Sequence, residues 1–201
     1  MTSHVSATQQ VIAEYVPMGA RVLDLGCGDG AMLAYLQHTR NCTGYGIEIA
    51  DDNVLACVQR GVNVIQSNLD EGLSMFEDAM FDVVLQIDTL QHLRHVEVML
   101  LETVRVGRVG IVAYPNFAHW KNRLSVLQGR MPVTSRLPYQ WYNTPNIRVG
   151  THADLGNLAH HCKIQVQDSF GILNGQTVRW LPNVWAETSV YKLSRCGPVP
   201  R

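Results

Sequence analysis

A strand-like segment, a glycine-rich turn and a helix-like segment follow one another without a break between residues 21 and 36. The apolar residues Val22, Leu23 and Leu25 suit a short strand that is buried on both faces, as in a parallel sheet. Glycines at positions 26, 28 and 30 let the backbone turn sharply and approach a ligand, because no Cβ atom stands in the way. Residues 31–36 then combine helix formers with helical apolar spacing. This order predicts a nucleotide-type binding site.

The same alternation of strand and helix continues along the chain. The predicted strands are residues 44–49, 62–66, 81–85 and 110–114, and the predicted helices are residues 5–16, 53–59, 95–104 and 154–162. Such alternation predicts an α/β fold with a mostly parallel sheet and helices on both faces. Residues 164–167 and 189–193 alternate in polarity and predict an antiparallel hairpin that closes the sheet edge. We expect a single domain over residues 1–201, with its ligand at the carboxyl ends of the parallel strands.

One segment, residues 117–150, departs from this pattern. It contains no Asp or Glu, and it is rich in basic and aromatic side chains: Lys121, Arg123, Arg130, Arg136, Arg148, Trp120, Tyr139, Trp141 and Tyr142. We expect a short helix at 120–127 and ordered loop elsewhere. An insertion of this length in a compact domain is more often functional than idle. Recognition of an anionic acceptor, docking of a partner and closure of the ligand pocket all fit its composition.

The overall charge and hydropathy exclude several classes of protein. A formal net charge of −1 gives no global attraction to nucleic acid or to an anionic membrane. The five basic residues of the insertion lack a wider basic surface, so we expect no nucleic-acid partner. Without a run of about 18 apolar residues, no transmembrane helix is expected.

Cysteine and histidine usage excludes two further kinds of site. The five cysteines include no C-x-x-C pair, which favours reduced thiols, a cytoplasmic location and no structural zinc. His92 and His95 lack a carboxylate or cysteine that would complete a metal site, so no metal is expected. Cys27 is expected to fill a cramped turn, because no basic neighbour in the sequence would activate its thiol.

The charges around the glycine turn indicate which nucleotide it binds. Its pattern is G-x-G-x-G, whereas dinucleotide sites have G-x-G-x-x-G. Asp24 and Asp29 would repel a pyrophosphate but attract an ammonium or sulfonium cation. Glu48 ends the second strand, where an acidic residue can hold the ribose hydroxyls. A nucleoside with a cationic appendage, such as S-adenosylmethionine, meets this description.

The stretch Leu23-Asp24-Leu25-Gly26-Cys27-Gly28-Asp29-Gly30 resembles the first motif of the class I S-adenosylmethionine-dependent methyltransferases. The likeness extends to the ribose-binding acid at Glu48, the adjoining Ile49, the adenine-contacting pair Asn68-Leu69 and the position of Gln86. It therefore implies cofactor contacts from Asp24, Gly26, Cys27, Gly28, Gly30, Glu48, Ile49, Asn68, Leu69 and Gln86.

Over roughly residues 9–193 the chain further resembles the methionine biosynthesis protein MetW family. The runs that carry this likeness are residues 44–48, 61–66, 89–91, 115–120, 129–134 and, most specifically, 137–147. The resemblance implies a Rossmann-like class I methyltransferase sheet of seven strands, with S-adenosylmethionine or S-adenosylhomocysteine as ligand. It also implies a role in methionine biosynthesis beside the homoserine O-acyltransferase.

Two positions depart from these patterns. Asn68 stands where the superfamily commonly has Asp, and its amide can still accept a hydrogen bond from the adenine amino group. A turn-capping role fits Asn68 equally well. Ile87-Asp88 replaces the Ser-Gln expected in the family.

Three functions remain open from the sequence. The chain can be an accessory protein that docks the acyltransferase through residues 117–150, or a methyltransferase for a small anionic acceptor. It can also be a sensor whose partner affinity depends on the bound cofactor. No residue is assigned as the catalytic group, and His92, which follows the fourth strand, is a weak candidate for a base.

Overall fold

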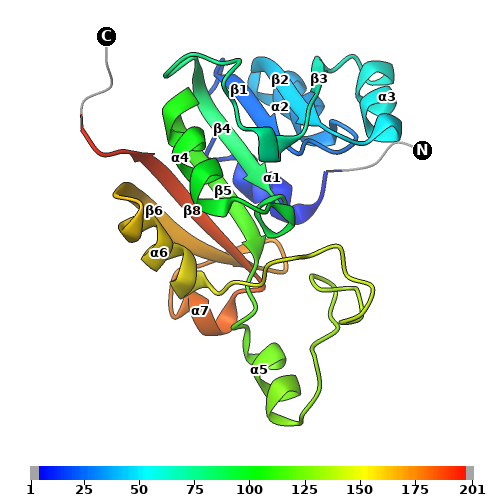
Figure 1. Ribbon diagram of the computed structural model, residues 1–201, viewed down its shortest axis with the longest axis vertical. Helices are drawn as coiled ribbons and strands as arrows, with labels where there is room; N and C mark the ends of the chain where they lie inside the picture. Colours follow the sequence, from blue (N-terminus) through cyan, green and yellow to red (C-terminus); the bar gives the residue numbers. More distant parts are fainter. Residues whose placement is uncertain (1–4, 198–201) are drawn as a thin grey trace.

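The computed structural model describes residues 5–197, which are built around one sheet of eight strands in the order β3-β2-β1-β4-β5-β8-β6-β7. The strands are β1 (Arg21–Leu25), β2 (Thr43–Glu48), β3 (Val64–Gln66), β4 (Phe81–Ile87), β5 (Gly107–Pro115), β6 (Ile164–Leu173), β7 (Gln176–Val178) and β8 (Thr188–Arg195). β1 to β5 are parallel, and β8 runs antiparallel between β5 and β6 (Figure 1). This confirms the predicted mostly parallel α/β sheet with a closing antiparallel pair.

Helices cover both faces of the sheet and create two apolar cores. The helices are α1 (Ala7–Ala13), α2 (Ala31–Arg40), α3 (Asp51–Gln59), α4 (Val96–Val106), α5 (Trp120–Leu127), α6 (His152–His161) and α7 (Pro182–Trp185). Leu23 and Leu25 belong to the core under α4 and α6, whereas Val22 belongs to the core under α1 and α2. β1 is therefore buried on both faces, as its apolar run predicts. Within residues 5–197, no helix is long and apolar enough to cross a membrane.

The sheet differs from the expectation in three places. β7 adds an eighth strand, which pairs with the end of β6 and exceeds the seven that the resemblance implies. β6 and β8 are longer than the segments 164–167 and 189–193. Residues 170–172 of β6 and 188–191 of β8 are buried in succession, so these parts of the strands do not show the alternation of a half-exposed strand. β5 begins at Gly107 rather than at Gly110, since α4 passes into it without a loop. A Cβ atom at Gly107 would lie 2.5 Å from Val84 Cγ2, so glycine permits this close junction.

Residues 117–150 leave the carboxyl end of β5, carry α5 at their far end and return to α6 (Figure 1). The predicted helix at 120–127 is present. The returning chain is held by backbone bonds, in which the amides of Ile147 and Arg148 donate to the Gln91 carbonyl at 3.0 and 3.1 Å. Arg136 reaches across to Asp88 at the end of β4, with an Nη2–Oδ1 distance of 2.6 Å. The segment is thus fixed to the carboxyl edge of the sheet.

Candidate functional site

The glycine turn after β1 has the backbone geometry that only glycine adopts easily. Gly26, Gly28 and Gly30 have φ values of 72°, 56° and 76°. A Cβ atom at Gly26 would lie 2.7 Å from Thr89 Oγ1, so the turn also sits close against the chain that follows β4. The Thr89 hydroxyl donates to the Leu25 carbonyl at 2.7 Å. Residue 89 therefore supports the turn, a role that its place in a family run did not reveal.

Cys27 stabilises the same turn through its side-chain contacts. Its Sγ atom lies 3.8 Å from Cys57 Sγ in α3, and the Cys57 thiol donates to the Gly28 carbonyl at 3.2 Å. Burial raises the pKa of both thiols. A Cβ atom at Gly46 would approach Cys27 Sγ to 2.3 Å. Cys27 is therefore a packing residue, in agreement with the sequence interpretation.

Glu48 ties the glycine turn to the end of β2. One carboxylate oxygen accepts from the Gly28 amide at 2.8 Å, and the other accepts from the Ile49 and Ala50 amides at 2.9 and 3.0 Å. The side chain is only 8% exposed, yet it lines the cavity at this edge of the sheet. A carboxylate can accept more bonds than these three, so Glu48 retains capacity for a hydroxyl donor.

The two aspartates of the turn have different surroundings. Asp24 is 3% exposed and forms no ion pair within residues 5–197; burial, with a smaller contribution from Glu48, raises its carboxyl pKa to about 7. Asp29 instead pairs with Arg60 at 2.8 Å and accepts from the Ala31 amide at 3.1 Å. The expectation that both carboxylates attract the ligand therefore needs correction, because Arg60 balances the charge of Asp29.

A cavity of about 830 Å³ lies at the carboxyl ends of β1 to β4. Its size falls within the range of about 300–1,000 Å³ that is typical of small-molecule sites. Six of the predicted cofactor-binding and catalytic residues line it: Gly26, Glu48, Ile49, Asn68, Leu69 and His92. Asp70, Asp88, Thr89 and Ile147 also line it. The Asn68 side chain accepts from the Asp70 amide at 3.0 Å, so the turn-capping role is realised beside the cavity.

The other predicted cofactor-binding residues lie outside the cavity wall. Asp24, Cys27, Gly28 and Gly30 form or support the turn and do not line the cavity. Gln86 is fully buried, and its amide donates to the Thr103 hydroxyl in α4, away from the cavity. β4 continues to Ile87, whereas the predicted strand ended at residue 85. Residue 86 is therefore part of the strand, and its side chain lies in the interior.

His92 and Asp88 face the cavity beside residues 117–150. The His92 side chain is exposed, and its Nδ1 atom lies 3.2 Å from the Pro145 carbonyl oxygen. Asp88 adopts a positive φ of 56° and pairs with Arg136. The departure from the family pattern at Asp88 thus coincides with an ion pair to the insertion. Within residues 5–197, no group of three or more His, Cys, Asp or Glu side chains could hold a metal ion.

Asn116, directly after β5, organises the chain around the site. It is 1% exposed; its amide group donates to the Ala186 carbonyl at 2.8 Å, and its side-chain oxygen accepts from the Ala118 and His152 amides, both at 3.1 Å. One side chain therefore joins the starts of the insertion and of α6 to the loop before β8. The sequence identified residues 115–120 as a family run without indicating this role.

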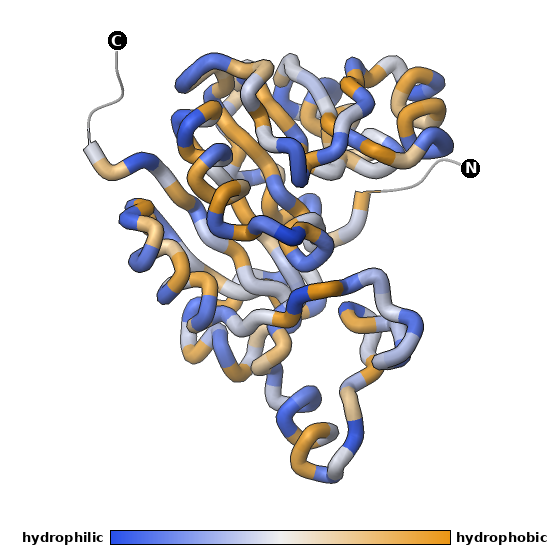
Figure 2. The backbone as a smooth tube through the Cα atoms, in the orientation of Figure 1, coloured by the Kyte–Doolittle hydropathy of each residue, from blue (hydrophilic) through white to orange (hydrophobic). Residues whose placement is uncertain are grey.

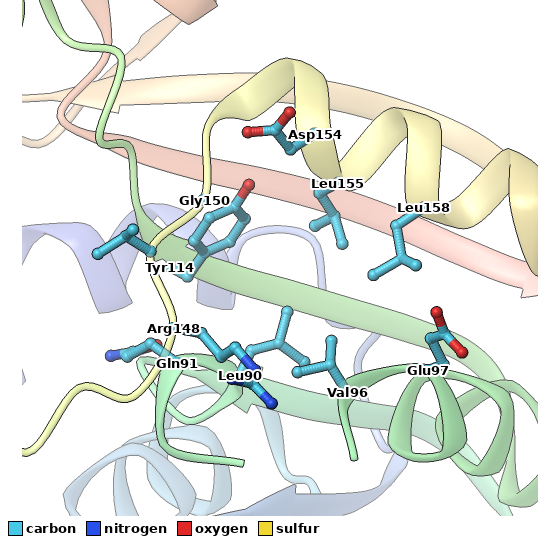
Figure 3. A pocket seen from close by; sticks show the side chains of 11 residues that line it. Leu90, Gln91, Val96, Glu97, Tyr114, Arg148, Gly150, Asp154, Leu155 and Leu158 are labelled. Atoms are coloured by element: carbon cyan, nitrogen blue, oxygen red, sulfur yellow. The ribbon is translucent and has the colours of Figure 1, made fainter. Parts of the chain in front are cut away.

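A second cavity, of about 240 Å³, lies between α4 and α6 (Figure 3). Leu155 and Leu158 of α6 face Leu90 and Val96 across it. The Tyr114 ring forms one wall, and the Tyr114 hydroxyl donates to the Thr151 carbonyl. This cavity is mainly apolar; Leu90 and Gln91 line it, whereas Thr89 and His92 line the larger one.

The sheet order, the glycine turn and the acidic end of β2 define the class I S-adenosylmethionine-dependent methyltransferase fold. A solved S-adenosylmethionine-dependent methyltransferase from Thermotoga maritima superposes with a TM-score of 0.68 at 17% identity, covering 94% of this chain and 87% of that one. Residues 6–193 match the family described as methionine biosynthesis protein MetW. The chain belongs to this family.

Two curated relatives show how the match is distributed. The bifunctional methionine biosynthesis protein MetXA/MetW of Rhodopirellula baltica is 35% identical over 201 aligned residues, which cover 93% of this chain and 32% of that protein. A fatty-acid O-methyltransferase of Mycolicibacterium smegmatis is 33% identical over 97 residues, covering 46% of this chain and 35% of that protein. The match therefore spans only about a third of the length of each of these two relatives.

Proposed function

We propose that this protein binds S-adenosylmethionine or S-adenosylhomocysteine in the 830 Å³ cavity and assists the homoserine O-acyltransferase in methionine biosynthesis. The observation that carries the cofactor proposal is the junction of Glu48 with the glycine turn at the mouth of this cavity. Glu48 would accept the ribose hydroxyls, and Asn68 with Leu69 would contact the adenine. Asp24 would balance the positive charge of the methionine portion.

The partner proposal is supported by the Rhodopirellula baltica relative, whose name joins MetXA and MetW in one bifunctional protein. We take the MetXA part to be the acyltransferase that the family resemblance implies. In this relative the two parts belong to one chain. Where they are separate chains, we expect them to associate through an interface. The cytoplasm, where small-molecule biosynthesis takes place, is the proposed location.

Residues 117–150 are the proposed docking surface. They expose many large hydrophobic side chains. Figure 2 shows hydrophobic and hydrophilic residues following one another along the segment. The most exposed of these are Leu127, Trp141, Tyr142 and Val149. Aromatic and arginine side chains commonly anchor protein interfaces, and an exposed group of this kind is typical of an interaction site.

A pull-down with the purified acyltransferase tests the partner proposal, with its activity measured with and without S-adenosylmethionine. We expect micromolar association that Trp141→Ala weakens at least tenfold. Trp180→Ala is the matched control, because Trp180 is 71% exposed, Trp141 is 72% exposed, and Trp180 lies outside the segment. Absence of association, or equal loss from both variants, would refute docking through residues 117–150. Equal association with and without the cofactor would exclude the sensor mechanism.

Methyl transfer by this chain is the second candidate function. It is favoured by the exposed His92 side chain at the wall of the cavity, where a base can reach an acceptor. Methyl transfer from a sulfonium is an in-line displacement that depends mainly on positioning. Incubation of labelled S-adenosylmethionine with cell extract tests it; transfer that is lost in D24N supports an enzyme, and no transfer in varied extracts favours the accessory role.

A further inference from the structure

A third cavity, of about 250 Å³, lies between the start of α5, the turn at residues 134–137 and the chain just before β8. α5 contributes Lys121 and Asn122, the turn contributes Arg136, and Glu187 closes the opposite side. The turn is held by two backbone bonds between Thr134 and Leu137, of 2.9 and 3.2 Å. Positions 121 and 136 are therefore presented from ordered backbone.

The charges of this cavity have both signs and are not matched to each other. Lys121 and Arg136 supply two cations, and Glu187 supplies one carboxylate. The Nη2 atom of Arg136 is paired with Asp88, whereas its buried Nε atom has no hydrogen-bond partner among the described residues. Lys121 and Glu187 form no ion pair within residues 5–197. α5 begins here without a side-chain cap, so the dipole of the helix adds to the preference for an anion at the lysine side.

Two nearly buried side chains of the same cavity keep a polar atom without a hydrogen-bond partner. His119 is 3% exposed with its Nε2 atom unpaired, and Asn122 is 4% exposed with its Oδ1 atom unpaired. Buried polar groups are normally paired, and those left unpaired indicate a place for a ligand or an ordered water. Burial lowers the pKa of the His119 imidazole, so it is present as a neutral hydrogen-bonding group.

One ion pair links this cavity to the 830 Å³ cofactor cavity. Arg136 lines the third cavity and pairs with Asp88, which lines the cofactor cavity. The two cavities therefore lie on opposite sides of this pair, at the carboxyl edge of the sheet.

We propose that the cavity between α5, residues 134–137 and Glu187 is a second ligand site, and that it binds a free α-amino acid. The ligand carboxylate pairs with Lys121 and Arg136, and the ligand ammonium pairs with Glu187. A phosphate would meet Glu187 with like charge, and a simple amine would meet the two cations. A zwitterion matches both sides. This site uses none of the residues proposed for the cofactor.

Calorimetric titration of the full chain with each of the twenty common L-α-amino acids tests the proposal. We expect at least one to bind with millimolar or tighter affinity. Its analogues without the amino group or without the carboxylate, together with acetate and inorganic phosphate, should bind at least tenfold more weakly. Glu187→Gln and Lys121→Met should each weaken the amino acid at least tenfold. Glu14→Gln, which alters an exposed carboxylate of the α1 C-cap, is the matched control.

Three results would overturn the proposal: no amino acid binds, acetate or phosphate binds as tightly as the best amino acid, or the two variants bind like the control. S-adenosylmethionine affinity, measured in parallel, should be equal in all these proteins and shows that the variants fold. If the cofactor fails to bind while an amino acid binds, the cofactor proposal fails and this one stands.

Discussion

Replacing Asp24 by Asn should make the protein more stable and its cofactor site weaker. Burial raises the pKa of the Asp24 carboxyl from 3.8 to about 7 in the folded protein, which at ~1.36 kcal/mol per unit corresponds to about 4 kcal/mol. Because the folded protein holds the proton more tightly than the unfolded chain, the free energy of unfolding falls as the pH rises from about 4 to about 7. Above that range the full cost of about 4 kcal/mol is present.

Chemical denaturation at two pH values measures this cost. At pH 5.5 about half of it is present, so the stability advantage of D24N over the natural protein should grow by about 2 kcal/mol between pH 5.5 and pH 8. Asp52→Asn, an exposed carboxylate in the first turn of α3, controls for the change in formal charge. An advantage that does not change with pH, or one that Asp52→Asn reproduces, would show that the burial argument is wrong.

The D24N substitution, which should increase stability, should decrease the affinity for the cofactor. A cationic ligand favours the ionised form of Asp24, so affinity for S-adenosylmethionine should increase as the pH rises from 6 to 8. The D24N variant should bind at least tenfold more weakly and lose most of this pH dependence. Calorimetric titration over this range measures both effects, and unchanged affinity in D24N would remove Asp24 from the site.

Three further substitutions test the support of the site. Gly46→Ala places a Cβ atom 2.3 Å from Cys27 Sγ and should cost about 1–3 kcal/mol in urea denaturation, with part of the loss recovered by adding Cys27→Ala. Glu48→Gln, which removes the charge and replaces one of the two acceptor oxygens by an NH2 group, should lower cofactor affinity by about tenfold to a hundredfold in titration. Asn116→Ala leaves three buried backbone groups unpaired and should lower the free energy of unfolding by about 3 kcal/mol or more, again measured with urea.

The parts of the fold that follow from local pattern were predictable. Alternation of strand and helix is a short-range signal, so the sheet class and the turn at Gly26 to Gly30 could be predicted directly. The end of β4 was harder, because residue 86 has the polarity of a site residue, although its amide pairs with Thr103 in the interior. β7 has only three residues, which is too short for an alternating pattern to be recognised.

Contacts between distant residues account for what the sequence did not reveal. Asp24 and Asp29 are five positions apart and look equivalent in the sequence. Arg60, directly after α3, pairs with Asp29, whereas Asp24 is buried with a raised pKa. In the sequence, Asn116 is one polar residue after a strand. In the folded protein, its side chain forms hydrogen bonds with the backbone of residues 118, 152 and 186. The ion pair between Arg136 and Asp88, which lies between the cofactor cavity and the third cavity, likewise joins residues that are distant in the sequence.

The order of residues therefore establishes the parallel sheet, the glycine turn and the acid at position 48, because steric limits and hydrophobic period act over a few residues. The folded chain decides which carboxylate pairs with Arg60, which one is buried with a raised pKa, and where residues 117–150 attach. It also decides that the third cavity, whose lining carries charges of both signs, forms beside the cofactor cavity. These outcomes depend on burial and on partners from remote segments, which no local pattern contains.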